Sequence, residues 1–216
     1  MHLTPAARPR SESLRVLRSG DAIANPVTGE RFVVRVAARE SGGERFEVER
    51  FLPPDHPRQP ERVHPRQETR ITVVRGVAGF KLEGTVRMAL PGEQLVAPAG
   101  APHQLWNAGG DTLHLRFEQR PGLESTERLL VALCALAAAG KTDSHGIPGL
   151  LQRAVMMPAY ADTLRLTSPP WLVQRALCRL LGPLARARGH RPFVEEWTSV
   201  LVSAGDADSS DSLACK

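Results

Sequence analysis

The stretch GEQLVAPAGAPHQLWN restricts what this chain can fold into more than any other part of its sequence. Gly92 permits a turn with a positive φ before a strand, and Pro98 ends that strand. Gly100 allows a tight loop to reverse the chain, so that His103 begins the next strand. Together with Asn107, these positions deliver one imidazole to a defined point between two strands. A loop histidine without a role is the alternative for any lone His, but the full set of spaced positions disfavours it.

Short strands with turns between them account for the chain up to residue 121. Glycine or proline turns interrupt the apolar segments about every eight to twelve residues, a spacing typical of an antiparallel sandwich or barrel and not of a parallel sheet. We predict one strand between Gly92 and Pro98 and another that begins at His103. Further strands are predicted at residues 31–37, 45–52, 77–82, 85–90 and 112–118.

The composition changes sharply after the last predicted strand. Residues 124–139 are strong helix formers, and their apolar side chains surround the helix axis, which predicts a helix packed on two sides. A second helix is predicted at 148–157. A third is predicted at 169–188, with Ser168 as its N-cap, and Pro183 is expected to kink or split it.

The domain organisation follows from these elements. Residues 14–121 are expected to form one β domain, because no internal repeat indicates a second barrel. Residues 122–203 are expected to form a helical extension. The Pro-, Arg- and Ser-rich residues 1–13 and the polar residues 204–216 are expected to be disordered.

Length and composition limit the class of protein. The chain has 216 residues, of which 42% are hydrophobic and 24% charged, as in a soluble globular protein. The longest apolar run, residues 129–139, is too short to cross a bilayer, and the N-terminal residues lack the apolar segment of a signal peptide. We therefore expect a cytoplasmic protein without a membrane partner. The net charge of +5 is spread among glutamates without a nucleic-acid-binding motif, so no nucleic-acid partner is expected.

The spacing G-x5-P-x-G-x2-H-x3-N resembles the complete second signature motif of the cupin superfamily. The resemblance implies a mainly β fold, namely a single jelly-roll β-barrel of antiparallel strands, here followed by a C-terminal α-helical appendage. It also implies a homodimer, because such barrels often pair through sheet edges that would otherwise stay unpaired. The alternative is that the helical appendage covers the barrel or its mouth.

The segment RVHPRQETRITVVRG resembles the first cupin motif, and most closely that of a bacterial single-barrel (monocupin) group, roughly HxHPxQEExFxVLxG. In the family, this motif and the later histidine supply three imidazoles and one carboxylate to a divalent metal. His64 and His103 match two of these ligands, and Arg62 occupies the position of the first histidine. The carboxylate position falls on Thr69 or, with the shorter spacing, on Glu68.

These replacements favour a site without metal, and a divalent transition metal is the alternative. Two unit charges about 4 Å apart interact by about 4 kcal/mol at an effective dielectric constant of about 20, so Arg62 would repel a divalent ion by about 8 kcal/mol. Two imidazoles also fall short of the three protein ligands usual for catalytic zinc or iron. If a metal is bound, its predicted ligands are His64, Glu68 and His103.

The retained residues form the predicted catalytic site. The resemblance places His64 and His103 on facing strands inside the barrel, where either imidazole can titrate near neutral pH as a catalytic acid or base. Arg62 can bind a carboxylate, enolate or phosphate of a substrate by paired hydrogen bonds. A salt bridge between Arg62 and Glu68 is the alternative.

Four further residues complete the predicted substrate-binding set. Glu68 and Thr69 belong to it through the first motif. Trp106 is close to the motif histidine, and Tyr160 follows the second predicted helix, so each can line the pocket. For both aromatic residues, packing within the core or between helices is the alternative.

These features lead to three functional hypotheses. The first is a metal-independent isomerase, epimerase or cyclase of specialised metabolism, which holds a small organic substrate beside the histidine pair. The resemblance supports it, because some cupins catalyse such reactions without redox metal chemistry. The second is a metal-dependent, dioxygenase-like cupin that uses iron, manganese, nickel or zinc. The third is a barrel that binds a ligand without turnover.

Overall fold

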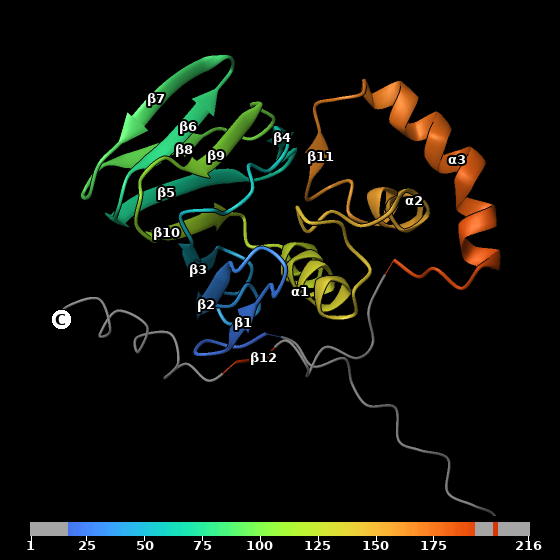
Figure 1. The fold of residues 1–216 in the computed structure, drawn as a ribbon, viewed down its shortest axis with the longest axis horizontal. Helices are drawn as coiled ribbons and strands as arrows, with labels where there is room; N and C mark the ends of the chain where they lie inside the picture. Colours follow the sequence, from blue (N-terminus) through green and yellow to red (C-terminus); the bar gives the residue numbers. More distant parts are fainter. Residues whose placement is uncertain (1–16, 193–200, 203–216) are drawn as a thin grey trace, which may run out of the picture.

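Two antiparallel sheets and three helices make up the part of the chain that the computed structural model describes, residues 17–192 and 201–202 (Figure 1). The first sheet has the strand order β12-β1-β2-β3-β10-β5-β8, and the second has the order β11-β4-β9-β6-β7. The predicted mainly β fold is confirmed in the form of two sheets, without a closed ring of strands among these residues. The ends predicted to be disordered, 1–13 and 204–216, lie outside the described residues.

The strands predicted from alternation all occur with nearly the same limits. The first sheet consists of β1 (Ala22–Ala24), β2 (Arg31–Val36), β3 (Phe46–Leu52), β5 (Glu68–Arg75), β8 (Gln94–Ala97), β10 (Leu113–Arg120) and β12 (Leu201–Val202). The second sheet consists of β4 (Arg62–Val63), β6 (Ala78–Leu82), β7 (Thr85–Ala89), β9 (His103–Asn107) and β11 (Arg165–Leu166).

The interior between the sheets is apolar along most of its length. Alternation on β5 turns Thr69, Ile71 and Val73 inward. Ile71 and Val73 belong to a buried cluster that takes side chains from both sheets, including Phe80 of β6 and Leu115 of β10. Thr69 is the polar end of this inward row.

Helix α1 (Glu124–Ala138) is packed on two sides, as its apolar circumference predicts. Cys134 belongs to the cluster buried against the first sheet, and Leu136 packs against Met156 of α2 (Leu150–Ala159). Figure 1 shows α1 between strands β1 to β3 and α2. None of the helices in residues 17–192 has the length and apolar character needed to cross a bilayer.

The C-terminal part of the chain adds a short strand to each sheet, which was not predicted. β11 pairs with β4 through Arg165 and Val63, and β12 pairs with β1. Both strands are only two residues long, too short for a period-two pattern to reveal them. Because these strands pair across residue 121, the division of the chain into 14–121 and 122–203 stays a prediction.

Helix α3 (Trp171–Ala187) begins later than predicted. Its N-cap is Pro170, and Ser168 does not cap it. The reason is local: Pro169 is itself followed by a proline, and a residue before proline is disfavoured in the helical region.

Helix α3 also continues past Pro183 without splitting, which corrects part of the prediction. Gly182 precedes the proline and has no Cβ to clash with the proline ring, which reduces the cost of this position. The apolar row predicted on α3 is found on its exposed side, where Leu180 is 75% exposed and Leu184 44%.

Glu127 connects α1 to the first sheet. Its Oε1 accepts a hydrogen bond from the backbone N–H of Ala38 at 2.6 Å, while its buried Oε2 has no hydrogen-bond partner among the described residues. Burial raises the pKa of Glu127 from 4.5 to about 7, although the Ala38 bond opposes the shift. Folding therefore favours the protonated carboxyl group. This contribution to stability is fully present below the unfolded pKa and is lost as pH rises through the folded pKa.

Replacing Glu127 with Gln is expected to remove this pH dependence. The free energy of unfolding of the wild type should fall between about pH 5 and about pH 8 relative to that of Glu127→Gln, because only the carboxyl group loses a proton. Urea unfolding followed by circular dichroism measures the difference. Asp55→Asn, at an exposed position in the loop after β3, is the control. Parallel pH profiles for wild type and Glu127→Gln would contradict the burial of an ionisable group here.

Candidate functional site

A cavity with two adjoining chambers lies between the sheets and the helical extension. The first, which we call the strand chamber, has a volume of about 140 Å³ and is lined by strands of the first sheet and by α1. The second, the helix chamber, has a volume of about 160 Å³ and is lined by α1, α2 and the loops beside them. Residues common to both linings are Gln59, Arg62, Leu129, Leu133, Gly146 and Leu164.

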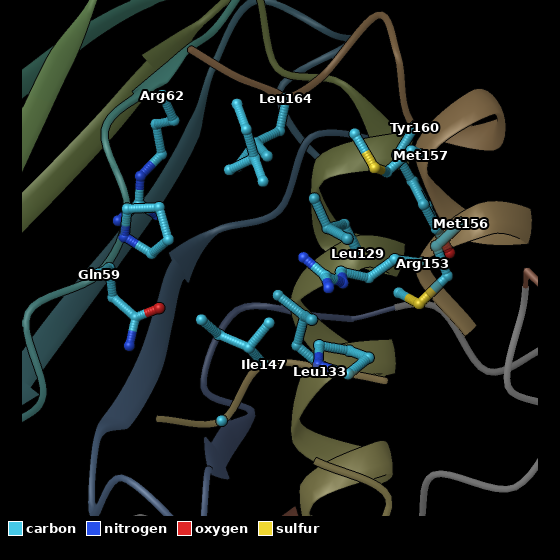
Figure 2. A pocket seen from close by; sticks show the side chains of 14 residues that line it. Gln59, Arg62, Leu129, Leu133, Ile147, Arg153, Met156, Met157, Tyr160 and Leu164 are labelled. Atoms are coloured by element: carbon cyan, nitrogen blue, oxygen red, sulfur yellow. The ribbon is translucent and has the colours of Figure 1, made fainter. Parts of the chain in front are cut away.

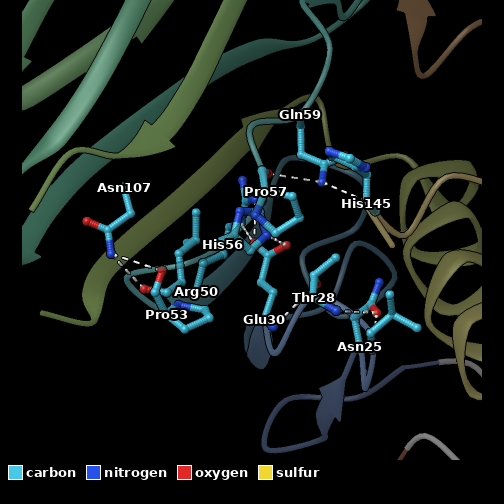
Figure 3. Close-up of polar contacts among 12 residues, drawn as sticks. Asn25, Thr28, Glu30, Arg50, Pro53, His56, Pro57, Gln59, Asn107 and His145 are labelled. Atoms are coloured by element: carbon cyan, nitrogen blue, oxygen red, sulfur yellow. Dashed lines mark hydrogen bonds and ion pairs between the residues drawn. The ribbon is translucent and has the colours of Figure 1, made fainter. Parts of the chain in front are cut away.

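A buried carboxylate with two basic partners lines the strand chamber. Arg50 Nε donates to Glu30 Oε1 at 2.8 Å, and His56 Nε2 lies 3.2 Å from Glu30 Oε2 (Figure 3). Burial alone would raise the pKa of Glu30, but Arg50 and His56 outweigh it and lower the pKa to about 2. Glu30 is therefore ionised at neutral pH, and Arg50 already balances its charge.

Arg62 is the cation that this cluster leaves uncompensated. It lines both chambers and makes no hydrogen bond or ion pair with a described residue. Burial and, to a lesser extent, the charge of Arg50 lower its pKa to about 10 against the opposing effect of Glu30, so Arg62 stays protonated at neutral pH. Figure 2 shows Arg62 across the helix chamber from Leu129 and Leu133 of α1.

The two motif histidines are neighbours, with ring centroids 5.1 Å apart. His64 Nδ1 lies 2.7 Å from the carbonyl oxygen of Thr163, and His103 Nδ1 lies 3.0 Å from that of Ala101. Because a carbonyl oxygen can only accept, each Nδ1 carries the hydrogen and each Nε2 is left as an acceptor. His64 lines the strand chamber, whereas His103 lines neither chamber and lies against Phe80.

Both imidazoles are neutral at pH 7. Burial lowers the pKa of His64 to about 3, and the neighbouring His103 and Arg62 add to this effect. Burial also lowers the pKa of His103 to about 4, again with a contribution from Arg62. The prediction that either ring titrates near neutral pH is therefore wrong. Protonation would place a second cation beside Arg62 in a region with little water.

The two candidate positions for the motif carboxylate face in opposite directions. Thr69 is buried, and Gln119 Nε2 donates to its hydroxyl oxygen at 3.4 Å. Glu68 precedes it on β5 and so faces away from the interior, where it lies 2.6 Å from Arg70. The alternative salt bridge between Arg62 and Glu68 is therefore not the one that forms.

The alternative metal-ligand set of His64, Glu68 and His103 is not assembled. Within residues 17–192 and 201–202, no group of three or more His, Cys, Asp or Glu side chains is placed to hold a metal ion. The interior offers two neutral imidazoles beside the cationic Arg62. This donor set does not fit the divalent metal that the cupin resemblance implies.

Of the two aromatic candidates, only Tyr160 lines the cavity. It is part of the helix chamber, and burial raises its pKa to about 12, so its hydroxyl group is protonated at neutral pH. Trp106 lies on the other face of β9, where the guanidinium carbon of Arg58 sits 3.5 Å from its ring centroid. Gly79 leaves the space that this indole ring fills. Trp106 therefore packs on the second sheet and does not contact the cavity.

Two residues hold parts of the site in position, and this role was not predicted for either of them. Asn107, the last residue of the second motif, donates from Nδ2 to the carbonyl oxygens of Leu52 at 3.0 Å and Pro53 at 3.1 Å (Figure 3). It thereby holds the start of the loop that carries His56. Thr163 follows α2, and no local pattern marks it as the acceptor for an imidazole so distant in sequence.

No family model matches this chain, and no curated protein matches it either. The cupin domain of Cnp3 from Schizosaccharomyces pombe is 12% identical to this chain, with a TM-score of 0.37. The match covers 43% of this chain and 64% of the Cnp3 domain, which is less than two thirds of the length of that domain. An RmlC-like cupin from Shewanella frigidimarina is 15% identical with a TM-score of 0.38, over 46% and 82% of the two chains. An oxalate decarboxylase from Lactobacillus farciminis is 15% identical with a TM-score of 0.38, over 44% and 29%. These likenesses concern the fold alone.

The two antiparallel sheets, together with the complete spacing of the second motif, agree with the fold that the resemblance to cupins implies. The helical extension after residue 122 takes part in the site. It supplies the far wall of the cavity and the carbonyl group that orients His64.

The protonation state of the histidine pair is testable by NMR. We expect the Hε1 resonances of His64 and His103 to keep their neutral positions from about pH 8 to about pH 5, and His64→Gln and His103→Gln assign the two signals. Because both folded pKa values lie below 6.5, the stability linked to the neutral rings is present above about pH 6.5 and is lost as pH falls towards the folded values. Titration of either ring near pH 6.5 would show that the pair is accessible to water.

Proposed function

We propose that this protein binds a small organic anion with an apolar body in the two-chamber cavity, and that Arg62 holds the anionic group. The observation that carries the proposal is the position of Arg62, which lines both chambers without a partner among the described residues. A buried guanidinium group without a counter-charge is costly, and an anion removes that cost.

The charges around Arg62 select for an anion. Glu30 is the carboxylate that interacts with Arg62, but Arg50 and His56 already occupy both of its oxygens. A carboxylate, enolate or phosphate of the ligand would supply the missing counter-charge of Arg62 through paired hydrogen bonds to its planar guanidinium group. A cationic ligand would be repelled by Arg50 and Arg62 together.

The helix chamber suits the apolar body of the ligand. Its lining is mostly aliphatic and includes sulfur-containing side chains, namely Leu129, Leu133, Ile147, Met156, Met157 and Leu164. Burial of apolar surface there contributes about 25 cal/mol per Å² to binding. Methionine side chains adapt to ligands of irregular shape, so this chamber favours a class of related compounds.

Thermal stabilisation tests the binding proposal. We expect octanoate and 3-phenylpropionate to raise the Tm of the wild type and 1-octanol to raise it less, because only the carboxylates meet Arg62. Arg62→Gln should lose about 10- to 100-fold in affinity, the equivalent of about 1.5–3 kcal/mol for hydrogen bonds to a charged group. Arg66→Gln, an exposed neighbour, is the matched control. Equal stabilisation of Arg62→Gln and wild type would refute the role of Arg62.

We further propose isomerase- or cyclase-type chemistry in which His64 Nε2 accepts a proton from the bound ligand. Of the two motif histidines, His64 is the one that lines the strand chamber, and its Nδ1–H bond to Thr163 leaves Nε2 as the basic atom. Arg62 would stabilise the resulting enolate, and the same proton would return to another atom, so the reaction needs no oxidant. A bound anion would also counteract the lowering of the His64 pKa by Arg62.

Hydrogen exchange of the bound ligand separates turnover from binding alone. In D2O, we expect the wild type to incorporate deuterium at the carbon next to the ketone of 2-oxooctanoate faster than the protein-free solution does, detected by mass spectrometry, and His64→Gln to lose this acceleration while it still binds. Binding without any acceleration by the wild type would leave the protein a ligand-binding cupin and contradict the catalytic proposal.

A further inference from the structure

We propose that Arg153 is a second anion-binding residue of the helix chamber, so that the ligand carries an anionic group at each end of its apolar body, as an aliphatic dicarboxylate does. This inference rests on the proposed binding function, because it concerns the same cavity. It goes further by naming the substrate class and a second specificity-determining residue.

Arg153 reaches the cavity from α2, on the side opposite to β4. Figure 2 shows its side chain directed into the helix chamber beside Leu129, with Arg62 on the opposite wall. The Nε atom of Arg153 is fully buried and has no hydrogen-bond partner among the described residues. A buried N–H group normally donates to a carboxylate or carbonyl oxygen, so Nε lacks the acceptor that its burial requires, although Arg153 as a whole is only partly buried.

The charge of the helix chamber has one sign. Two arginines line it, and neither an aspartate nor a glutamate is among its lining residues. The only other polar side chains there are those of Gln59 and Tyr160, and Tyr160 stays protonated because burial raises its pKa to about 12. A monoanion bound at Arg62 would therefore leave the charge of Arg153 unbalanced.

The wall between the two guanidinium groups is apolar. Leu164 and Ile147 lie between Arg62 and Arg153 in Figure 2, and Leu129 faces them from α1. A polar chain would lose its hydrogen bonds to water in this region, whereas a methylene chain would not. Anionic at both ends and apolar in the middle, an α,ω-dicarboxylate complements the chamber.

Calorimetric titration with two matched series of ligands tests the inference. The probes are the dicarboxylates succinate, adipate, suberate and sebacate, and the monocarboxylates butyrate, hexanoate, octanoate and decanoate, at constant ionic strength. We expect one dicarboxylate to bind the wild type at least about tenfold more tightly than the monocarboxylate of the same length. The optimal length would report the span between the two arginines.

Variants distinguish this inference from the binding proposal itself. Arg153→Gln should abolish the preference for the dicarboxylate over the monocarboxylate of the same length, and Arg153→Lys should restore part of it. Arg62→Gln should weaken both series, and Arg128→Gln, on the exposed side of α1, should change neither. Circular dichroism and Tm confirm that each variant is folded.

Two outcomes would overturn these ideas separately. Equal affinity of the wild type for the two series, with Arg62→Gln still weakening both, would refute the role of Arg153 alone. Failure of every probe in both series to bind the folded wild type would refute the proposed anion site.

Discussion

The need to satisfy buried polar groups where the sheets meet the helical extension governs much of this structure. His64 donates to the carbonyl oxygen of Thr163, and Glu127 accepts from the backbone N–H of Ala38. Each bond joins residues that are far apart in sequence and excludes water from the space between them. The same bonds fix the His64 tautomer and place α1 as a wall of the cavity. The site therefore exists only when sheets and extension are folded together.

Electrostatics explains why this site departs from the metal chemistry of its fold. Replacing a ligand histidine with Arg62 introduces a fixed cation, and burial keeps both remaining imidazoles neutral. If both rings were protonated, His64, His103 and Arg62 would be three neighbouring cations that repel one another. Neutral rings avoid this repulsion. The charge of Arg62 that remains is the basis of the anion binding proposed above.

Much of the fold was predictable from local pattern, and less of the site. Turn residues and alternation predicted the main strands, and the apolar circumference of residues 124–139 predicted a helix packed on both sides. The two-residue strands β11 and β12 escaped prediction because they are held by pairing across long sequence distances. Helix α3 was predicted with Pro183 as a kink or a break, and the structure rules out the break, because Gly182 has no Cβ to clash with the proline ring.

By itself, the sequence determined the cupin-type fold and the presence of His64, His103 and Arg62 at motif positions, because turn geometry and strand period are local properties of the chain. Only the tertiary structure decided that Glu68 faces away from the interior while Thr69 faces into it. It also decided that Glu30 pairs with Arg50 and leaves Arg62 without a partner. The reason is physical: burial, partners and protonation of a side chain depend on strand register and on helices distant in sequence, which no local spacing encodes.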